Sequence, residues 1–313
     1  MEGLAIDPRR FTLIYFWIIF NLFAIAALAL DMLLLRRKGR AVGFREALLR
    51  SGGWVVLAAA FAVLVRFWLG HQPALEFVTG YVIELSLSVD NLFVFLLVFR
   101  YFAVPEEHQH RVLFWGIIGA LLMRGVFIVA GVGLVHSFHG VFYLLGALLI
   151  FSGLRICVAG DRPADPASNP AVRLVRRWFP VTENYEGGKF FVRRATGVAV
   201  TPLLLVLLVI ETTDVLFAVD SIPAVLSITL NTFIVYTSNV LAILGLRSLY
   251  FAVSGVMQLF RFLHYGLAMV LVLTGVKMLA ADYYQVSTTA ALAAVAGVLL
   301  MAVAASLVWP KTS

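Results

Sequence analysis

The sequence predicts an all-α polytopic membrane protein of about nine transmembrane helices, and two observations carry this prediction. Hydrophobic residues make up 62% of the 313 residues and charged residues 13%. A soluble domain has about 45–50% and about 25%, so this chain has too few polar side chains to cover a surface that faces water. In addition, apolar runs of about 20 residues, the length of a membrane-crossing helix, recur along the whole chain.

The nine runs take up most of the chain, and the longest polar stretch is too short to build a core of its own. The first run continues too far for a cleaved signal peptide and is stopped by Arg36, Arg37 and Lys38, so we expect an uncleaved span. The predicted spans are 11–35, 52–70, 74–99, 112–135, 140–158, 198–227, 232–255, 263–281 and 287–309. The chain 1–313 is then a single transmembrane domain, with two peripheral spans in 11–73, three spans in 74–158, a cytoplasmic loop in 159–196, three spans in 197–281 and a last span in 287–309.

Basic residues in the connections set the predicted orientation. Seventeen Lys and Arg fall in connections on one side of the nine spans, and only Arg9 and Arg10 fall on the other. By the positive-inside rule, the N-terminus is outside and the C-terminus is in the cytoplasm. Most of the basic residues behind the net charge of +7 lie in these short connections. The sequence therefore predicts contact with membrane lipid and no nucleic-acid partner.

The spans of 74–158 and those of 197–281 resemble each other. The third span contains an acid, five residues, Asp and Asn from Glu84 onward, and the sixth contains an acid, five residues, Asp and Ser from Asp214 onward. Further matches follow in order in the next two spans of each group, namely Arg124 with Arg247 and Gly153 with Gly275. Because three spans is an odd number, the second copy runs the opposite way through the bilayer. The sequence thus predicts a 3+3 inverted-topology repeat of spans 3–5 and 6–8, which is typical of transporters.

Five carboxylates are predicted at depth in the third and sixth spans. A charged side chain at the centre of a membrane helix costs about 2.5–3.5 kcal/mol of insertion free energy. Five unpaired carboxylates that face lipid would therefore cost roughly 12–17 kcal/mol. We therefore expect them to converge on cations, on protons or on a watery cavity. The five are Glu84, Asp90, Glu211, Asp214 and Asp220.

Two arginines at similar depth, Arg124 and Arg247, offset part of this negative charge. If all seven groups share one cavity, five acids and two arginines leave a charge of −3. A divalent cation reduces this charge to −1, and one or two protons would then neutralise the site. This balance favours a divalent-metal site coupled to protonation. The alternative is a buried salt-bridge network that only holds helices together.

The polar residues that accompany the acids are oxygen donors, and neither acidic motif contains Cys or His. Such a donor set favours a hard cation, and Mn²⁺, Mg²⁺ and Ca²⁺ all fit it. Pro202 and Pro223 in the sixth span also predict a broken helix, which would aim both of its aspartates at one ion. The candidate accessory residues are Ser88, Asn91, Ser221 and Asn239, the last of which could instead bond to another helix.

The sequence predicts no enzyme. It lacks zinc-protease, nucleophile-elbow and Walker motifs. An intramembrane aspartyl protease built on Asp90 and Asp220 would need a glycine-flanked aspartate, which is absent. Two pairs of histidines in the connections are weaker metal candidates, namely His108 with His110 and His136 with His139.

At these motifs the sequence resembles the TerC/Alx family of bacterial membrane proteins, and the Alx-type members most closely. The resemblance covers about residues 10–309, and its most specific segment runs from Glu211 to Pro223. The other segments that carry it are 79–91, 102–105, 191–194 and 237–247. It implies a multi-pass protein of the bacterial inner membrane, associated with manganese export and with tellurite or alkaline stress. It also implies that the five acids form the metal route.

The first functional hypothesis is therefore a secondary transporter that exports Mn²⁺ from the cytoplasm in exchange for protons, with Arg124 and Arg247 tuning the empty site. The choice of Mn²⁺ and the direction of transport rest on the resemblance. A second hypothesis is a membrane partner that supplies metal to secreted proteins or assists their insertion. In that case the loop 159–196 would contact the protein-secretion machinery.

Overall fold

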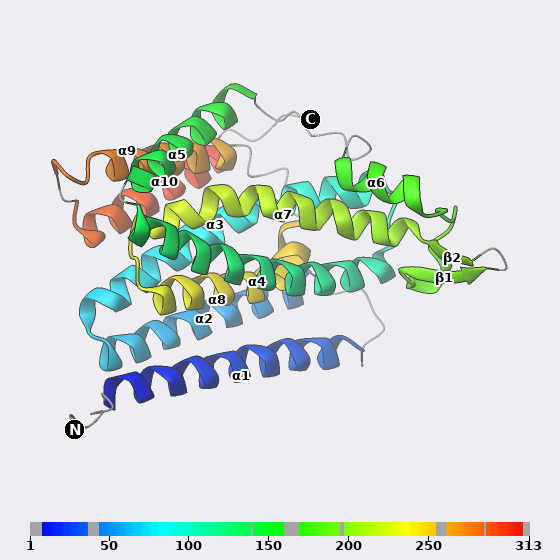
Figure 1. Ribbon diagram of the computed structural model, residues 1–313, viewed down its shortest axis with the longest axis horizontal. Helices are drawn as coiled ribbons and strands as arrows, with labels where there is room; N and C mark the ends of the chain where they lie inside the picture. Colours follow the sequence, from blue (N-terminus) through cyan, green and yellow to red (C-terminus); the bar gives the residue numbers. More distant parts are fainter. Residues whose placement is uncertain are drawn as a thin grey trace. The chain divides into compact units, whose positions relative to one another are not determined.

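The computed structural model describes residues 8–36, 44–138, 140–159, 169–194, 197–254, 262–284 and 286–308, which fall into two compact units. The first unit, Met1–Arg40, holds the helix α1 (Pro8–Arg36). The helices of the second unit, Ala41–Ser313, are α2 (Phe44–Trp68), α3 (His71–Tyr101), α4 (Glu106–Ser137), α5 (Gly140–Ala159), α6 (Pro170–Trp178), α7 (Pro202–Leu226), α8 (Thr232–Ser254), α9 (Leu263–Leu279) and α10 (Thr288–Val308), and they are drawn in Figure 1. Between α6 and α7 lie a 3₁₀ turn, η2 (Glu186–Gly188), and the strands β1 (Phe191–Arg194) and β2 (Gly197–Val200).

The predicted all-α polytopic membrane fold is confirmed. A described helix lies over each of the nine predicted segments. Within the described residues, seven helices are long and apolar enough to cross a membrane, and α1 and α9 contain shorter apolar segments, Ile14–Leu30 and His264–Leu279. The sixth predicted segment starts later than expected, because β2 takes its first residues and pairs antiparallel with β1. The helix then begins at Pro202, whose fixed backbone angle suits the first helical position.

The predicted break in the sixth span is wrong. The helix α7 is continuous from Pro202 to Leu226, with Pro223 inside it, and α3 is likewise one helix from His71 to Tyr101. Pro223 removes the hydrogen bond to the carbonyl of Val219 and its ring crowds that carbonyl, but only three residues of α7 follow it. The carbonyl of Pro223 still accepts a hydrogen bond from the backbone N–H of the capping residue Ser227 (3.0 Å).

The packing of the second unit is paired in the way that the predicted repeat requires. In the predicted repeat, α3 corresponds to α7, α4 to α8 and α5 to α9. The contact of α3 with α8 in one half then corresponds to the contact of α7 with α4 in the other, and both pairs are in contact. The same correspondence leaves the close pair of α5 and α9 unchanged, which lie side by side in Figure 1.

The contact of α5 with α9 shows the same pairing at individual residues. A Cβ atom at Gly153 would meet the carbonyl oxygen of Ala268 at 2.6 Å, and a Cβ atom at Gly275 would meet that of Gly146 at 2.6 Å. Gly153 lies 122 positions before Gly275, and Gly146 lies 122 positions before Ala268, so exchange of the two copies turns one contact into the other. The inverted repeat stays a prediction, and these contacts support it.

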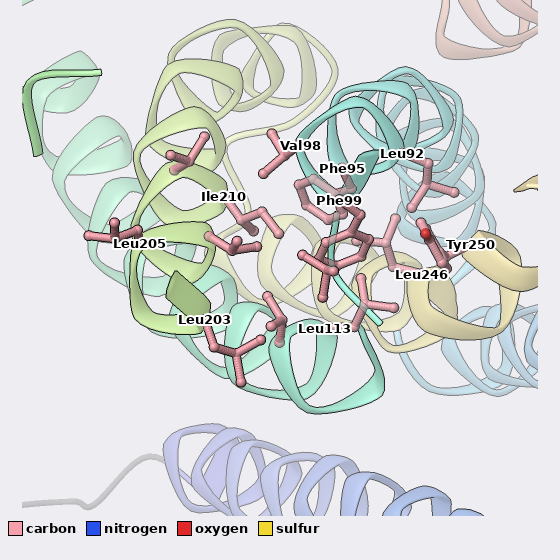
Figure 2. Close-up of a cluster of buried hydrophobic side chains, with 14 of the residues drawn as sticks. Leu92, Phe95, Val98, Phe99, Leu113, Leu203, Leu205, Ile210, Leu246 and Tyr250 are labelled. Carbon is pink, nitrogen blue, oxygen red and sulfur yellow. The ribbon is translucent and has the colours of Figure 1, made fainter. Parts of the chain in front are cut away.

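Two clusters of buried apolar side chains lie along α3, α4, α7 and α8. Figure 2 shows the first, which we call the aromatic cluster: it includes Leu92, Phe95, Phe99, Leu113, Leu203, Ile210, Leu246 and Tyr250. The second, the aliphatic cluster, includes Ile83, Ile128, Val132, Leu149, Ile222, Val225, Val235 and Leu271. Along α3 the aliphatic cluster comes first, and along α7 the aromatic cluster comes first. The two helices therefore run in opposite directions, as the predicted inversion requires, and the stretch between the clusters carries the buried Glu84, Arg124, Asp214 and Asn239.

Candidate functional site

One buried arginine joins side chains from four helices. Arg124 on α4 is 3% exposed and forms an ion pair with Glu84 on α3, which is fully buried. The same guanidinium nitrogen, Nη1, donates to Ser221 Oγ on α7 at 3.1 Å and to Asn239 Oδ1 on α8 at 2.9 Å. We call these four residues the arginine cluster. Asn239, for which the sequence left two roles open, belongs to it.

A second carboxylate lies beside this cluster. Asp214 on α7 is 5% exposed and close enough to Arg124 and Glu84 to interact electrostatically with both. It stands seven residues before Ser221, and therefore on the same face of α7. This face turns towards α4, because Ser221 on it accepts a hydrogen bond from Arg124.

A third carboxylate packs against a glycine of the neighbouring helix. The side chain of Glu211, half-buried on α7, rests so closely on Gly119 of α4 that a Cβ atom at position 119 would overlap its carboxylate. Glu211 stands one turn before Asp214, and the two carboxylates interact electrostatically. Helix α4 thus positions two members of the group, one through the side chain of Arg124 and the other through the lack of a side chain at Gly119. The sequence analysis missed this contact.

The face of α3 next to the cluster is polar and buried. Glu84, Ser88 and Asn91 follow each other at helical spacing and are at most 3% exposed. Among the described residues, Glu84 Oε2 and Ser88 Oγ have no hydrogen-bond partner although both atoms are buried. A buried oxygen without a partner is costly, and few occur in proteins. The two oxygens, one helical turn apart, can accept a proton donor or a cation.

The structure gives the remaining predicted residues other surroundings. Asp220 on α7 turns towards α5, where Ser152 Oγ donates to its Oδ1 at 2.6 Å and Arg155 interacts with it electrostatically. Arg247 is buried on α8, eight residues and so about 12 Å beyond Asn239, within electrostatic range of His110. Asp90 lies in α3, and its side chain falls outside the described part of the structure. The premise that seven charged groups share one cavity is therefore not what the structure shows: it brings together Glu84, Glu211, Asp214 and Arg124.

No group of three or more His, Cys, Asp or Glu side chains within the described residues could hold a metal ion as they stand. The two histidine pairs do not change this. His108 packs against Tyr185 and His110 against Phe251, so the two turn to different neighbours. His139 and the side chain of His136 lie outside the described residues.

The segment between α6 and α7, predicted as a plain loop, is ordered against the end of the aromatic cluster. Its Tyr185 hydroxyl donates to the carbonyl of Phe102, and Arg111 of α4 donates to the carbonyl of Gly188. Burial of the phenol raises the pKa of Tyr185. Gly188 has a φ of +76°, and a Cβ atom there would meet the His108 ring at 3.0 Å, so glycine suits this turn. The segment thus covers one end of the helices that carry the acids.

Comparison with known proteins gives consistent results. The model of the integral membrane protein TerC family matches residues 69–313. The chain is 44% identical to the membrane protein STKORF319 of Myxococcus xanthus, over 93% of the chain and 92% of that protein. It is 41% identical to the "Putative membrane-bound redox modulator Alx" of Escherichia coli K12, over 88% of each. It is also 35% identical to a membrane protein of Rickettsia bellii, over 93% of the chain and 97% of that protein. No solved structure matches it.

Proposed function

The chain belongs to the TerC family of integral membrane proteins, and from that premise we propose that it is a secondary transporter that exports a divalent metal ion, Mn²⁺, in exchange for protons. We place it in the bacterial inner membrane, with the N-terminus outside and the C-terminus in the cytoplasm, as the distribution of basic residues predicts. The inverted 3+3 repeat is part of this proposal, because it supplies the two halves that move against each other during transport.

The observation that carries the proposal is the excess of negative charge in the group around Arg124. Among the described side chains, the carboxylates of Glu84, Glu211 and Asp214 meet one guanidinium, which leaves a charge of −2 if all are ionised. One divalent cation neutralises that charge, and so do two protons. A salt-bridge network with a purely structural role has no need of two excess acids in an apolar surrounding.

The donor atoms support a hard cation. Carboxylate, hydroxyl and amide oxygens surround Arg124, and the described neighbours include no thiol or imidazole. Such donors suit Mn²⁺, Mg²⁺ and Ca²⁺ better than Cu⁺ or Zn²⁺. The preference for Mn²⁺ comes from the family resemblance.

The name of the relative from Escherichia coli refers to redox modulation. This chain has one cysteine, the exposed Cys157, and so cannot form an internal disulfide. An effect on cellular redox state could not use an internal dithiol–disulfide pair, and a change in the supply of a metal ion is one route that needs none.

Transport by the purified protein tests the proposal. The liposomes contain a dye whose fluorescence Mn²⁺ quenches. The wild-type chain should transport Mn²⁺ into them without any partner protein, and faster when a proton gradient drives protons out as Mn²⁺ enters. Asp214→Asn and Glu211→Gln should each slow the flux at least tenfold. Glu107→Gln is the matched control, because that acid lies on α4 and is 77% exposed. If the wild type transports Mn²⁺ only with a translocon present, the membrane-partner hypothesis replaces transport. If it gives no flux in either setting, the proposal is refuted.

A further inference from the structure

We propose that Arg124 is an internal cation that occupies the binding site while the metal is absent and has to leave Glu84 before the metal can bind. The proposal rests on the proposed function, in that it concerns the same site and the same divalent ion. It goes beyond that function because it gives Arg124 the part of a competitor of the metal, and it is tested by binding rather than by flux.

The partners of Arg124 are the first argument. The guanidinium contacts oxygen atoms from three other helices: the Glu84 carboxylate, the Ser221 hydroxyl and the Asn239 amide oxygen. These are the donor types that a hard divalent cation takes from a protein. Arg124 is 3% exposed, so neither its charge nor that of Glu84 is solvated by bulk water. The guanidinium therefore already fills an oxygen-lined site for a cation.

The unused atoms around it are the second argument. Glu84 offers one oxygen to Arg124, while its Oε2 and Ser88 Oγ are buried without a partner among the described residues. The described acids do not converge on a metal in this arrangement. A divalent ion held by Glu84 and Asp214 would repel the adjacent guanidinium of Arg124, so binding of the ion favours opening of the ion pair. Metal binding and the release of Arg124 are then two sides of one exchange.

The helices that the cluster joins are the third argument. Arg124 and Glu84 come from α4 and α3, whereas Ser221 comes from α7 and Asn239 from α8, in the other half of the predicted repeat. In transporters of this kind, one repeat rocks against the other around the site. The contacts of Arg124 bridge the halves, so its release by the metal also removes a cross-link between them. Loading of the site is in this way coupled to movement.

Equilibrium binding of Mn²⁺ to the purified full-length protein, measured from the electron paramagnetic resonance signal of free Mn²⁺, tests this inference. Removal of the competitor in Arg124→Gln should lower the Kd roughly tenfold or more, within the range of couplings seen between linked sites. Mn²⁺ should also raise the Tm of this variant more than that of the wild type. The matched control is Arg45→Gln, which removes the guanidinium of an exposed residue on α2 and should leave the Kd unchanged.

A second variant keeps the test decisive if Arg124→Gln does not fold. Arg124→Lys keeps the charge, but a lysine ammonium is more strongly hydrated than a guanidinium, so it loses more on burial and competes less well for the buried oxygens. Its Kd should fall severalfold. An unchanged or higher Kd in both variants, or in the lysine variant when only that one folds, overturns the inference. The proposed function fails separately, through absence of wild-type flux in liposomes, because the comparison of Kd values needs no transport.

Discussion

The contact of Glu211 with Gly119 gives a sharp test of the site, because a single methyl group disturbs it. In Gly119→Ala, the new Cβ would overlap the Glu211 carboxylate, which has to retreat by roughly 1 Å or more to reach an ordinary contact distance. Over-packing costs about 1–3 kcal/mol, and here the displaced atoms end a flexible side chain, so we expect about 1 kcal/mol. For a chain of 313 residues, that loss corresponds to a fall in Tm of about 1–2 °C.

The effect on transport should be much larger than the effect on stability. The retreat moves one of the three described carboxylates of the group away from Asp214, and misplacement by about 1 Å can reduce the rate of a well-positioned reaction by orders of magnitude. We expect Mn²⁺ flux in liposomes to fall roughly tenfold or more at equal protein density. Flux and Tm are to be measured on the same preparation.

The matched control for this substitution is on the same helix. Gly133→Ala also adds a methyl group to α4, but nothing lies within 4 Å of its Cβ, so it should raise helix stability slightly and leave the flux unchanged. Wild-type flux in Gly119→Ala would refute the role given to Glu211, and so would an equal loss of flux in both alanine variants.

Three further outcomes are expected. Glu84→Gln should destabilise the protein by about 3–5 kcal/mol in thermal unfolding, because it leaves the buried Arg124 without its counter-charge. Adding Arg124→Gln should recover part of that loss. If the losses of the two single variants simply add in the double variant, the pairing is contradicted. Gly153→Ala and Gly275→Ala should lower the Tm by similar amounts, at a cost of about 1–3 kcal/mol each, because both push α5 and α9 apart at matched contacts; a clear inequality would count against the repeat. Tyr185→Phe should speed proteolysis between α6 and α7 by removing the hydrogen bond to the Phe102 carbonyl, worth about 0.5–1.5 kcal/mol, and an unchanged cleavage rate would count against this anchoring.

The sequence predicted the helices well because the bilayer imposes a simple rule on them. A run of about 20 apolar residues has to satisfy its backbone within the segment, so length and hydropathy locate each helix. The prediction of a break at Pro223 was wrong because α7 ends three residues after this proline, so no long helical segment follows it. The first residues of the sixth segment went into β2 because Pro202 favours a helix start at its own position.

The arrangement of the site was harder to predict, because helices that are apolar on nearly all sides give no period that tells which face meets which neighbour. Helical spacing puts Glu84, Ser88 and Asn91 on one face of α3, and the three are buried there. It could not tell that Asp220, beside Ser221 in the sequence, turns to Ser152 on α5. The contact of Glu211 with Gly119 depends on the distance between two helix backbones, which no pattern within either segment encodes.

The position of the charged group between two apolar clusters bears on how a transporter of this design would work. The aromatic cluster lies beyond the group at one end, and the aliphatic cluster lies beyond it at the other. An ion at Glu84 would therefore have to pass packed side chains in either direction, and a rotamer change alone does not open such a path. Because the two clusters lie on opposite sides of the charged group, a tilt of one half of the predicted repeat against the other about that group would loosen one cluster while compressing the other. The same tilt would strain the contacts of Arg124, so release of that arginine and opening of a path would occur in one movement.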